Sequence, residues 1–173
     1  MKHYPYLAMA LHWLSASVIL WALFSGFALA ADALPAPLAK EVPPVNVALT
    51  TLLVPFWLLR IFYRFRFRMP PPENMAARSW KMARYGHLAL YAFGSLSLSS
   101  GILMMERAVS VFGWFTLAAP LPAGPLTHGF ARVHFASNAL LALAVISHIA
   151  AVALHQRRGL SILRRMGPSQ AAR

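Results

Sequence analysis

The sequence predicts an all-α membrane protein, a four-transmembrane-helix bundle with both termini cytoplasmic. Hydrophobic residues make up 59% of the 173 residues, against about 45–50% in a typical soluble domain, and the mean hydropathy is +0.57. The apolar residues form long blocks, and most basic residues fall between the second and third blocks or after the fourth. Because no connecting segment is long enough for a catalytic domain, we expect residues 1–173 to form a single integral membrane domain.

The predicted spans cover residues of about 6–31, 45–63, 86–105 and 132–154. Each is near the roughly 20 residues that an α-helix needs to cross a hydrocarbon core of about 30 Å. The first block also resembles a secretory signal peptide, since Lys2 precedes it and the sequence ALAAD at 28–32 resembles a cleavage site. Its apolar run is longer than the roughly 7–15 residues of a signal h-region, so we interpret it as a span.

The connecting segments are short and carry no recognisable catalytic motif. The first is the proline-rich ADALPAPLAKEVPPV at 31–45, and the second is RMPPPENMAARSW at 68–80. The third, which includes FGWFTLAAPLPAGPLTHG at 112–129, is a longer apolar loop. Function is therefore expected to lie within the bundle or on its surface.

The basic residues indicate the orientation of the bundle. Two groups lie on one side of a four-span arrangement: Arg64, Arg66, Arg68, Arg78, Lys81 and Arg84, then Arg157, Arg158, Arg164, Arg165 and Arg173. The other two loops hold only Lys40, Arg107 and Arg132. The positive-inside rule places the richer side in the cytoplasm. We therefore attribute the net charge of +12 to topology and contact with the anionic lipid bilayer, and expect no nucleic-acid partner.

Two histidines are predicted to lie at the same depth in the membrane. His12 lies about 9 Å into the first span from the cytoplasmic side, at 1.5 Å per residue, and His148 lies at a similar depth in the fourth span. A polar side chain inside a membrane marks a functional site by default, and two opposed imidazoles are the axial ligands of a bis-histidine b-type haem. A hydrogen-bonded histidine pair and a proton relay are the alternatives.

His134 is a second candidate ligand on the helix that carries His148, at a different depth in the membrane. It precedes His148 by 14 residues, which is about 1,400° of rotation, within about 40° of four whole turns, and about 21 Å of rise. One helix face thus offers ligands for two stacked haems. His155, seven residues after His148, lies at the cytoplasmic edge and is expected to be an interfacial or proton-handling residue. The absence of cysteine excludes disulfides, thiolate metal sites and covalent c-type haem.

Five motifs together resemble the bacterial cytochrome b561 family. They are LHWLSASVILWALFSG at 11–26, LLRIFYRF at 58–65, YGHLALYAF at 85–93, GILMM at 101–105 and VHFASNALLALAVISHIAAVALH at 133–155. That family includes the membrane superoxide oxidase and is related to the cytochrome b subunits of membrane hydrogenases and formate dehydrogenases. The resemblance covers nearly the whole chain. It implies an integral membrane cytochrome b domain with two b haems, in the bacterial inner membrane.

The resemblance also implies roles for the histidines. His12 and His148 would hold the haem on the cytoplasmic side, and His134 would hold the haem on the periplasmic side. The family's fourth ligand is expected early in the second span, where this chain has Asn46. An amide is a poor iron ligand, so one haem is expected and the second is doubtful. Restoring the ligand by Asn46→His is expected to give a low-spin outer haem.

Several outcomes remain open for the outer haem. It is absent, or it is five-coordinate on His134, or it recruits His128, Met104 or Met105 as its second ligand. A histidine and methionine pair would raise the haem potential. We favour an absent outer haem, or one with an open coordination site, over ligation by His128 or by one of the two methionines.

Three further residues are candidates for cofactor binding. Arg132, near His134, would pair with a haem propionate or snorkel to the interface. Arg60, about one turn inside the cytoplasmic end of the second span, would bind a propionate or a quinone oxygen, or snorkel beside Arg64. His87 is expected to be a quinone-site or hydrogen-bonding residue.

The expected function is electron transfer through haem to quinone, ubiquinone or menaquinone. In one interpretation the chain is an enzyme, a quinone-linked oxidoreductase of the superoxide oxidase kind that takes electrons from a periplasmic-side donor such as superoxide. In the alternative it is a haem-carrying membrane anchor whose apolar outer loop docks a periplasmic dehydrogenase or hydrogenase. A third possibility is a haem-free scaffold.

Overall fold

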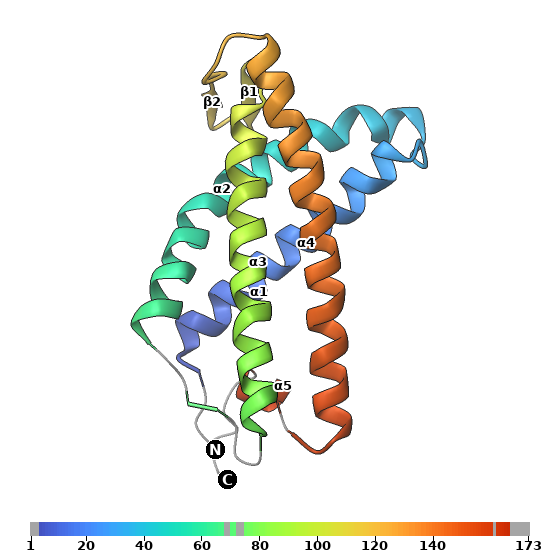
Figure 1. The fold of residues 1–173 in the computed structure, drawn as a ribbon. Helices are drawn as coiled ribbons and strands as arrows, with labels where there is room; N and C mark the ends of the chain where they lie inside the picture. Colours follow the sequence, from blue (N-terminus) through green and yellow to red (C-terminus); the bar gives the residue numbers. More distant parts are fainter. Residues whose placement is uncertain (1–3, 68–69, 72–74, 161, 167–173) are drawn as a thin grey trace.

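The computed structural model describes residues 4–67, 70–71, 75–160 and 162–166. Four long helices dominate the fold (Figure 1): α1 Tyr6–Ala30, α2 Ala36–Arg66, α3 Ala77–Leu103 and α4 Pro125–Arg157. A short helix, α5 Ile162–Arg165, follows α4, and the α3–α4 connection contains strands β1 Val109–Val111 and β2 Phe115–Leu117. Helix α1 packs along α2, and α3 packs along α4, so the bundle consists of two helical hairpins.

The beginning of the described chain and its end lie at the same end of the bundle (Figure 1). The backbone N–H of Tyr4 donates to the carbonyl of Arg165 at 3.2 Å, and the indole of Trp13 donates to the carbonyl of Met166 at the same distance. The buried Arg165 guanidinium donates to the Pro70 carbonyl at 3.0 Å. The segment after α4 therefore closes the bundle against α1 and the α2–α3 connection. We call this the inner end, and the end with the β-hairpin the outer end.

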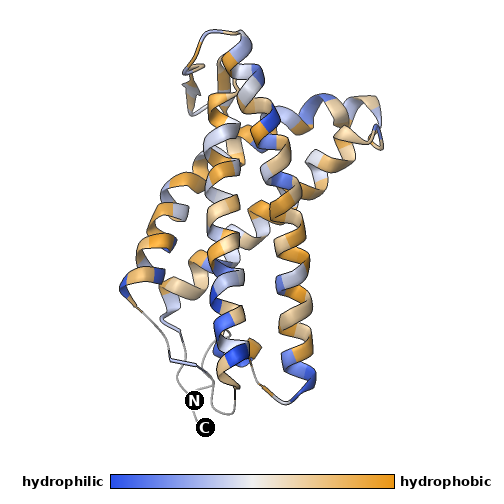
Figure 2. Cartoon of the chain, viewed as in Figure 1, coloured by the Kyte–Doolittle hydropathy of each residue, from blue (hydrophilic) through white to orange (hydrophobic). Residues whose placement is uncertain are grey.

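Three helices of the described chain are long and apolar enough to cross a membrane, namely α1, α2 and α4. Figure 2 shows hydrophobic residues over most of their length. Helix α3 is less apolar, because its uncharged stretch 86–103 contains His87 and a serine-rich segment at 95–100. The chain is a multi-pass membrane protein, and α3 runs beside α4 along most of its length (Figure 1).

Helix α2 begins earlier than the predicted span. The proline-rich stretch expected to be a connecting segment is helical from Ala36, and α2 contains Pro43, Pro44 and Pro55. A proline in the first turn costs no hydrogen bond, whereas an interior proline removes one and kinks the helix. Figure 1 shows the resulting bend in α2. Helices α3 and α4 likewise begin before their predicted spans.

The outer connection contains a β-hairpin that the sequence analysis described only as a loop. Val109 pairs with Leu117 and Val111 with Phe115 in antiparallel register. Residues 112–114 connect the strands: Phe112 and Gly113 have left-handed φ angles of 49° and 76°, and the backbone N–H of Trp114 donates to the Val111 carbonyl at 3.0 Å, which closes the turn. Val111 is completely buried, and β1 packs against α2. The hairpin is therefore anchored to the outer half of the bundle.

Candidate haem-binding site

Four polar side chains, one from each long helix, gather toward the inner end of the bundle. His12 of α1 accepts a hydrogen bond at Nδ1 from the Arg60 guanidinium of α2, at 2.9 Å. The His87 ring of α3 lies 5.3 Å from the His148 ring of α4, centroid to centroid, at an interplanar angle of 55°. The Arg60 guanidinium also lies over the ring of Tyr91 on α3, one turn from His87, which links the two pairs. We call these four residues the inner cluster.

Aromatic rings hold Arg60 in place. Its guanidinium carbon lies 5.4 Å from the ring centroids of both Trp57 and Tyr91. The Trp57 indole is buried and donates to the Ser95 hydroxyl at 3.0 Å. The indole packs against Gly94, where a Cβ atom would lie only 2.6 Å from the ring. A glycine on α3 thus permits the packing that positions Arg60.

The donor set of the inner cluster fits haem iron. A guanidinium only donates, so His12 Nδ1 accepts, and a neutral His12 ring then carries its proton on Nε2. Ligation through Nε2 therefore requires Arg60 to release Nδ1. His148 forms no hydrogen bond within the described residues, so its ring nitrogens have no competing partner there. Two imidazoles on helices from different hairpins, in an apolar bundle, are the chemistry of a bis-histidine b-type site.

An apolar groove lies between α1 and α4. Its volume is about 500 Å³, and it is lined by five residues of α1 between Leu20 and Ala28 and three residues of α4 between Ala142 and Ile146. Binding sites for small molecules and cofactors commonly have volumes of about 300–1,000 Å³ and mostly apolar walls. All of its lining residues lie outward of His12 on α1 and of His148 on α4, so the groove is an apolar surface between the two hairpins in the middle and outer part of the bundle.

The sequence profile of prokaryotic cytochrome b561 matches residues 3–169. The chain belongs to this family. No curated protein sequence matches the chain significantly. Membership indicates a membrane protein that binds b-type haem and transfers electrons, and it confirms the family resemblance derived from the motifs.

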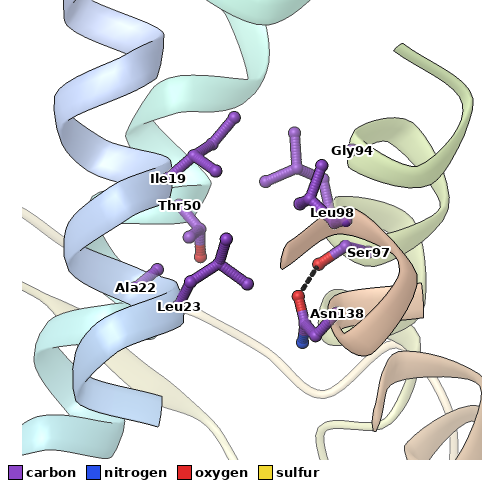
Figure 3. Close-up of a pocket in the computed structure, with 9 residues that line it drawn as sticks. Ile19, Ala22, Leu23, Thr50, Gly94, Ser97, Leu98 and Asn138 are labelled. Atoms are coloured by element: carbon purple, nitrogen blue, oxygen red, sulfur yellow. Dashed lines mark hydrogen bonds between the residues drawn. The ribbon is translucent and has the colours of Figure 1, made fainter. Parts of the chain in front are cut away.

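The outer half of this cytochrome b561 has a different polar arrangement, centred on His134. Its Nδ1 lies 3.0 Å from the Ser97 carbonyl, and its Nε2 lies 2.9 Å from Asn138 Nδ2. The Ser97 hydroxyl donates to Asn138 Oδ1 at 2.6 Å, as Figure 3 shows. The ring rests on Gly101, where a Cβ atom would lie 3.0 Å from His134 Cε1. Both ring nitrogens therefore have partners within the helical hairpin of α3 and α4.

Asn46, at the place where the fourth ligand was expected, forms no hydrogen bond with His134 in the described part of the chain. Its side-chain amide and the Ser25 hydroxyl of α1 are hydrogen-bonded at 3.0 Å. The Ser25 hydroxyl also donates to the Trp21 carbonyl at 2.7 Å. The structure thus pairs Asn46 with α1 inside the first hairpin, and His134 with α3 inside the second.

The remaining predicted residues are distributed around these two levels. Arg132 is exposed and forms no hydrogen bond or ion pair with a described residue. His128 lies 3.4 Å from the Glu106 carboxylate at the outer surface. Sequence reasoning missed Asn138 and Ser97, which hold His134. The position of Asn138, four residues after His134 on one helix face, was the available signal.

Proposed function

We propose that this cytochrome b561 transfers electrons between a donor and the quinone pool through a haem held by His12 and His148. The supporting observation is the inner cluster, in which each long helix contributes one polar side chain to a single level. We further propose that α3 also spans the bilayer, which gives four spans in the inner membrane with both termini cytoplasmic. The side chains of α3 that face α4 support this, because Ser97 and His87 are paired with α4 residues.

The residues of the inner cluster have distinct roles in this proposal. When bound, haem supplies a one-electron redox couple. His12 and His148 would hold the iron, and Arg60, released from His12 Nδ1, would bind an anionic or carbonyl oxygen, that of a propionate or of a quinone. The planar guanidinium of Arg60 can donate hydrogen bonds to either kind of oxygen. His87, next to His148, is a hydrogen-bonding residue at the quinone. Arg132 at the outer surface pairs with a propionate or with lipid phosphate.

Visible spectra of purified protein test the ligands. His12→Ala and His148→Ala should each abolish the low-spin haem signal in the reduced-minus-oxidised spectrum. His155→Ala is the matched control, because His155 is on the same helix seven residues further and is not a proposed ligand. An unchanged spectrum in both ligand variants would contradict the assignment.

Quinone reactivity tests the acceptor. Ubiquinol or menaquinol analogues should reduce the haem rapidly in detergent, and His87→Ala should slow this reduction while the oxidised spectrum stays unchanged. If neither quinol reduces the haem, the quinone role is wrong.

Two kinds of donor are proposed on the periplasmic side. One is a small oxidisable molecule such as superoxide, which makes the chain an enzyme. The other is a periplasmic dehydrogenase or hydrogenase docked on the hairpin, for which the chain is a membrane anchor. The hairpin favours the second, because Phe112, Trp114 and Phe115 expose 47%, 74% and 48% of their surface.

Supplying superoxide with quinone and no partner separates these candidates. Catalytic turnover supports the enzyme. Absence of turnover, together with co-purification of a periplasmic dehydrogenase that is lost on Trp114→Ala, supports the anchor.

A further inference from the structure

We propose that the outer level of this cytochrome b561 is not a haem site but a hydrogen-bonded lock between α3 and α4, and that the chain holds one haem. We call His134, Asn138 and Ser97 the outer lock. This inference rests on the proposed function only for the existence of the inner haem. It concerns the outer half of the bundle, which the family resemblance would supply with a second haem.

The donors and acceptors of the outer lock form a closed set. A backbone carbonyl only accepts, so His134 Nδ1 must donate to Ser97 O. The neutral ring then presents a lone pair at Nε2, which must accept from Asn138 Nδ2. The amide oxygen of Asn138 is left to accept from the Ser97 hydroxyl. Each group has one consistent role, and Asn138 would have to release Nε2, the nitrogen that would bind iron, before His134 could act as a ligand.

A ring rotation does not free Nε2 easily. The Gly101 backbone lies against the imidazole, at a separation too small for a Cβ atom without movement. The Ser100 hydroxyl lies 3.4 Å from Nδ1 on the same side. The imidazole is thus held between α3 and its own helix, and rotation would break the hydrogen bonds to Ser97 and Asn138 together.

The second axial ligand is missing: the residue at its expected place is an asparagine, and that residue is hydrogen-bonded to α1. A bis-histidine haem needs a second imidazole across the bundle, and this chain has Asn46 at the expected place. The Asn46 amide is engaged with Ser25, whose own side chain is buried. Two separate hydrogen-bonded pairs therefore replace the pair of ligands that a second haem requires.

The cavity enclosed by the four long helices one turn inward of His134 is small. A cavity of about 30 Å³ lies among the four long helices, and Thr50, Leu23, Ser97 and Asn138 are among its lining residues (Figure 3). This volume is enough for two or three water molecules, at about 10–15 Å³ each by the same measure. It is about a tenth of the smallest volume typical of a cofactor pocket, about 300 Å³.

Haem stoichiometry in the intact protein tests the inference directly. Haem extracted from purified wild-type protein and quantified against amino-acid analysis should approach one per chain, with a single low-spin species. His134→Ala should keep that haem and its spectrum, whereas His148→Ala should lose it. Two haems per chain in the wild type, or loss of a haem in His134→Ala, would overturn the inference and leave the inner haem of the proposed function intact. Protein without any haem would instead overturn the proposed function.

The outer lock also predicts effects on stability without effects on the haem. Asn138→Leu keeps a side chain of similar size but removes both of its hydrogen bonds, and His134→Ala removes the imidazole. Both should lower the unfolding midpoint in detergent, with the haem spectrum and its midpoint potential unchanged. Unchanged midpoints in both variants, or a shifted haem potential, would show that these residues do not act as a structural lock.

The outer lock revises one expectation from the sequence. Asn46→His was expected to restore a low-spin outer haem. Because Asn138 occupies His134 Nε2, Asn46→His alone should leave the content at one haem per chain. A second low-spin haem in this single variant would contradict the inference.

Discussion

Replacing Gly94 by alanine tests the packing that supports the inner cluster. A Cβ atom at this position would lie 2.6 Å from Trp57 Cζ2 and 2.9 Å from Cη2. Ordinary contact begins at 3.4 Å, so the indole must move by about 0.8 Å, the difference between 3.4 and 2.6 Å. The Trp57 indole also donates to Ser95 at 3.0 Å and lies under the Arg60 guanidinium. The movement is therefore passed on to the residue that contacts His12.

The expected loss of stability has two parts. Overpacking a well-packed interior costs about 1–3 kcal/mol. Weakening the hydrogen bond from Trp57 to Ser95 adds about 0.5–1.5 kcal/mol. Replacing glycine by alanine in a helix returns about 1 kcal/mol. Gly94→Ala should therefore lower the free energy of unfolding by about 0.5–3.5 kcal/mol.

Gly86→Ala provides the matched control, because Gly86 is on the same helix and nothing lies within 4 Å of its Cβ position. Both variants would be unfolded by denaturing detergent and followed by circular dichroism. The helix-propensity gain is common to both, so their difference isolates the contact with Trp57. Adding Trp57→Phe, which shortens the ring, should relieve part of the loss, giving a coupling of about 1 kcal/mol or more. Equal stability of the two alanine variants would refute the packing argument.

Three other changes probe separate parts of the fold. Thr127→Val removes a hydroxyl that donates to Glu106 at 2.7 Å and accepts from the backbone of Gly124 at 3.0 Å, and should cost about 1–3 kcal/mol in the same unfolding assay; no change would mean that these bonds add nothing. Gly113→Ala places a side chain at a φ of 76° and should cost about 1–2 kcal/mol, seen as faster proteolysis of the hairpin, while Gly113→Asn should be tolerated. In haem-free protein, where Arg60 donates to His12, Arg60→Gln should cost about 1.5–3 kcal/mol through the lost charged hydrogen bond, and wild-type stability of this haem-free variant would argue against that bond.

The prediction of the helices depended on local information. Hydropathy adds up along a segment, because each apolar side chain contributes its transfer free energy whatever its neighbours are. The sequence therefore located α1, α2 and α4 without any knowledge of packing. It placed the start of α2 too late, because proline content favours a loop, whereas the helix continues through Pro43 and Pro44 with a bend. The hairpin also escaped prediction, since its strands are three residues long.

The histidines show what only the tertiary structure decided. Spacing along one helix placed His134 and His148 on the same face, and the residue types suggested iron ligation for both. The partners of each ring depend on side chains from other helices, whose rotation and depth hydropathy does not specify. Folding gives His134 the Ser97 carbonyl and Asn138, whereas His148 has the neighbouring ring of His87 and no hydrogen bond among the described residues. Two histidines on one face of the same helix thus differ in their hydrogen-bond partners. A hydrogen bond depends on the direction and distance between two helices, whereas the hydropathy of a span depends on neither.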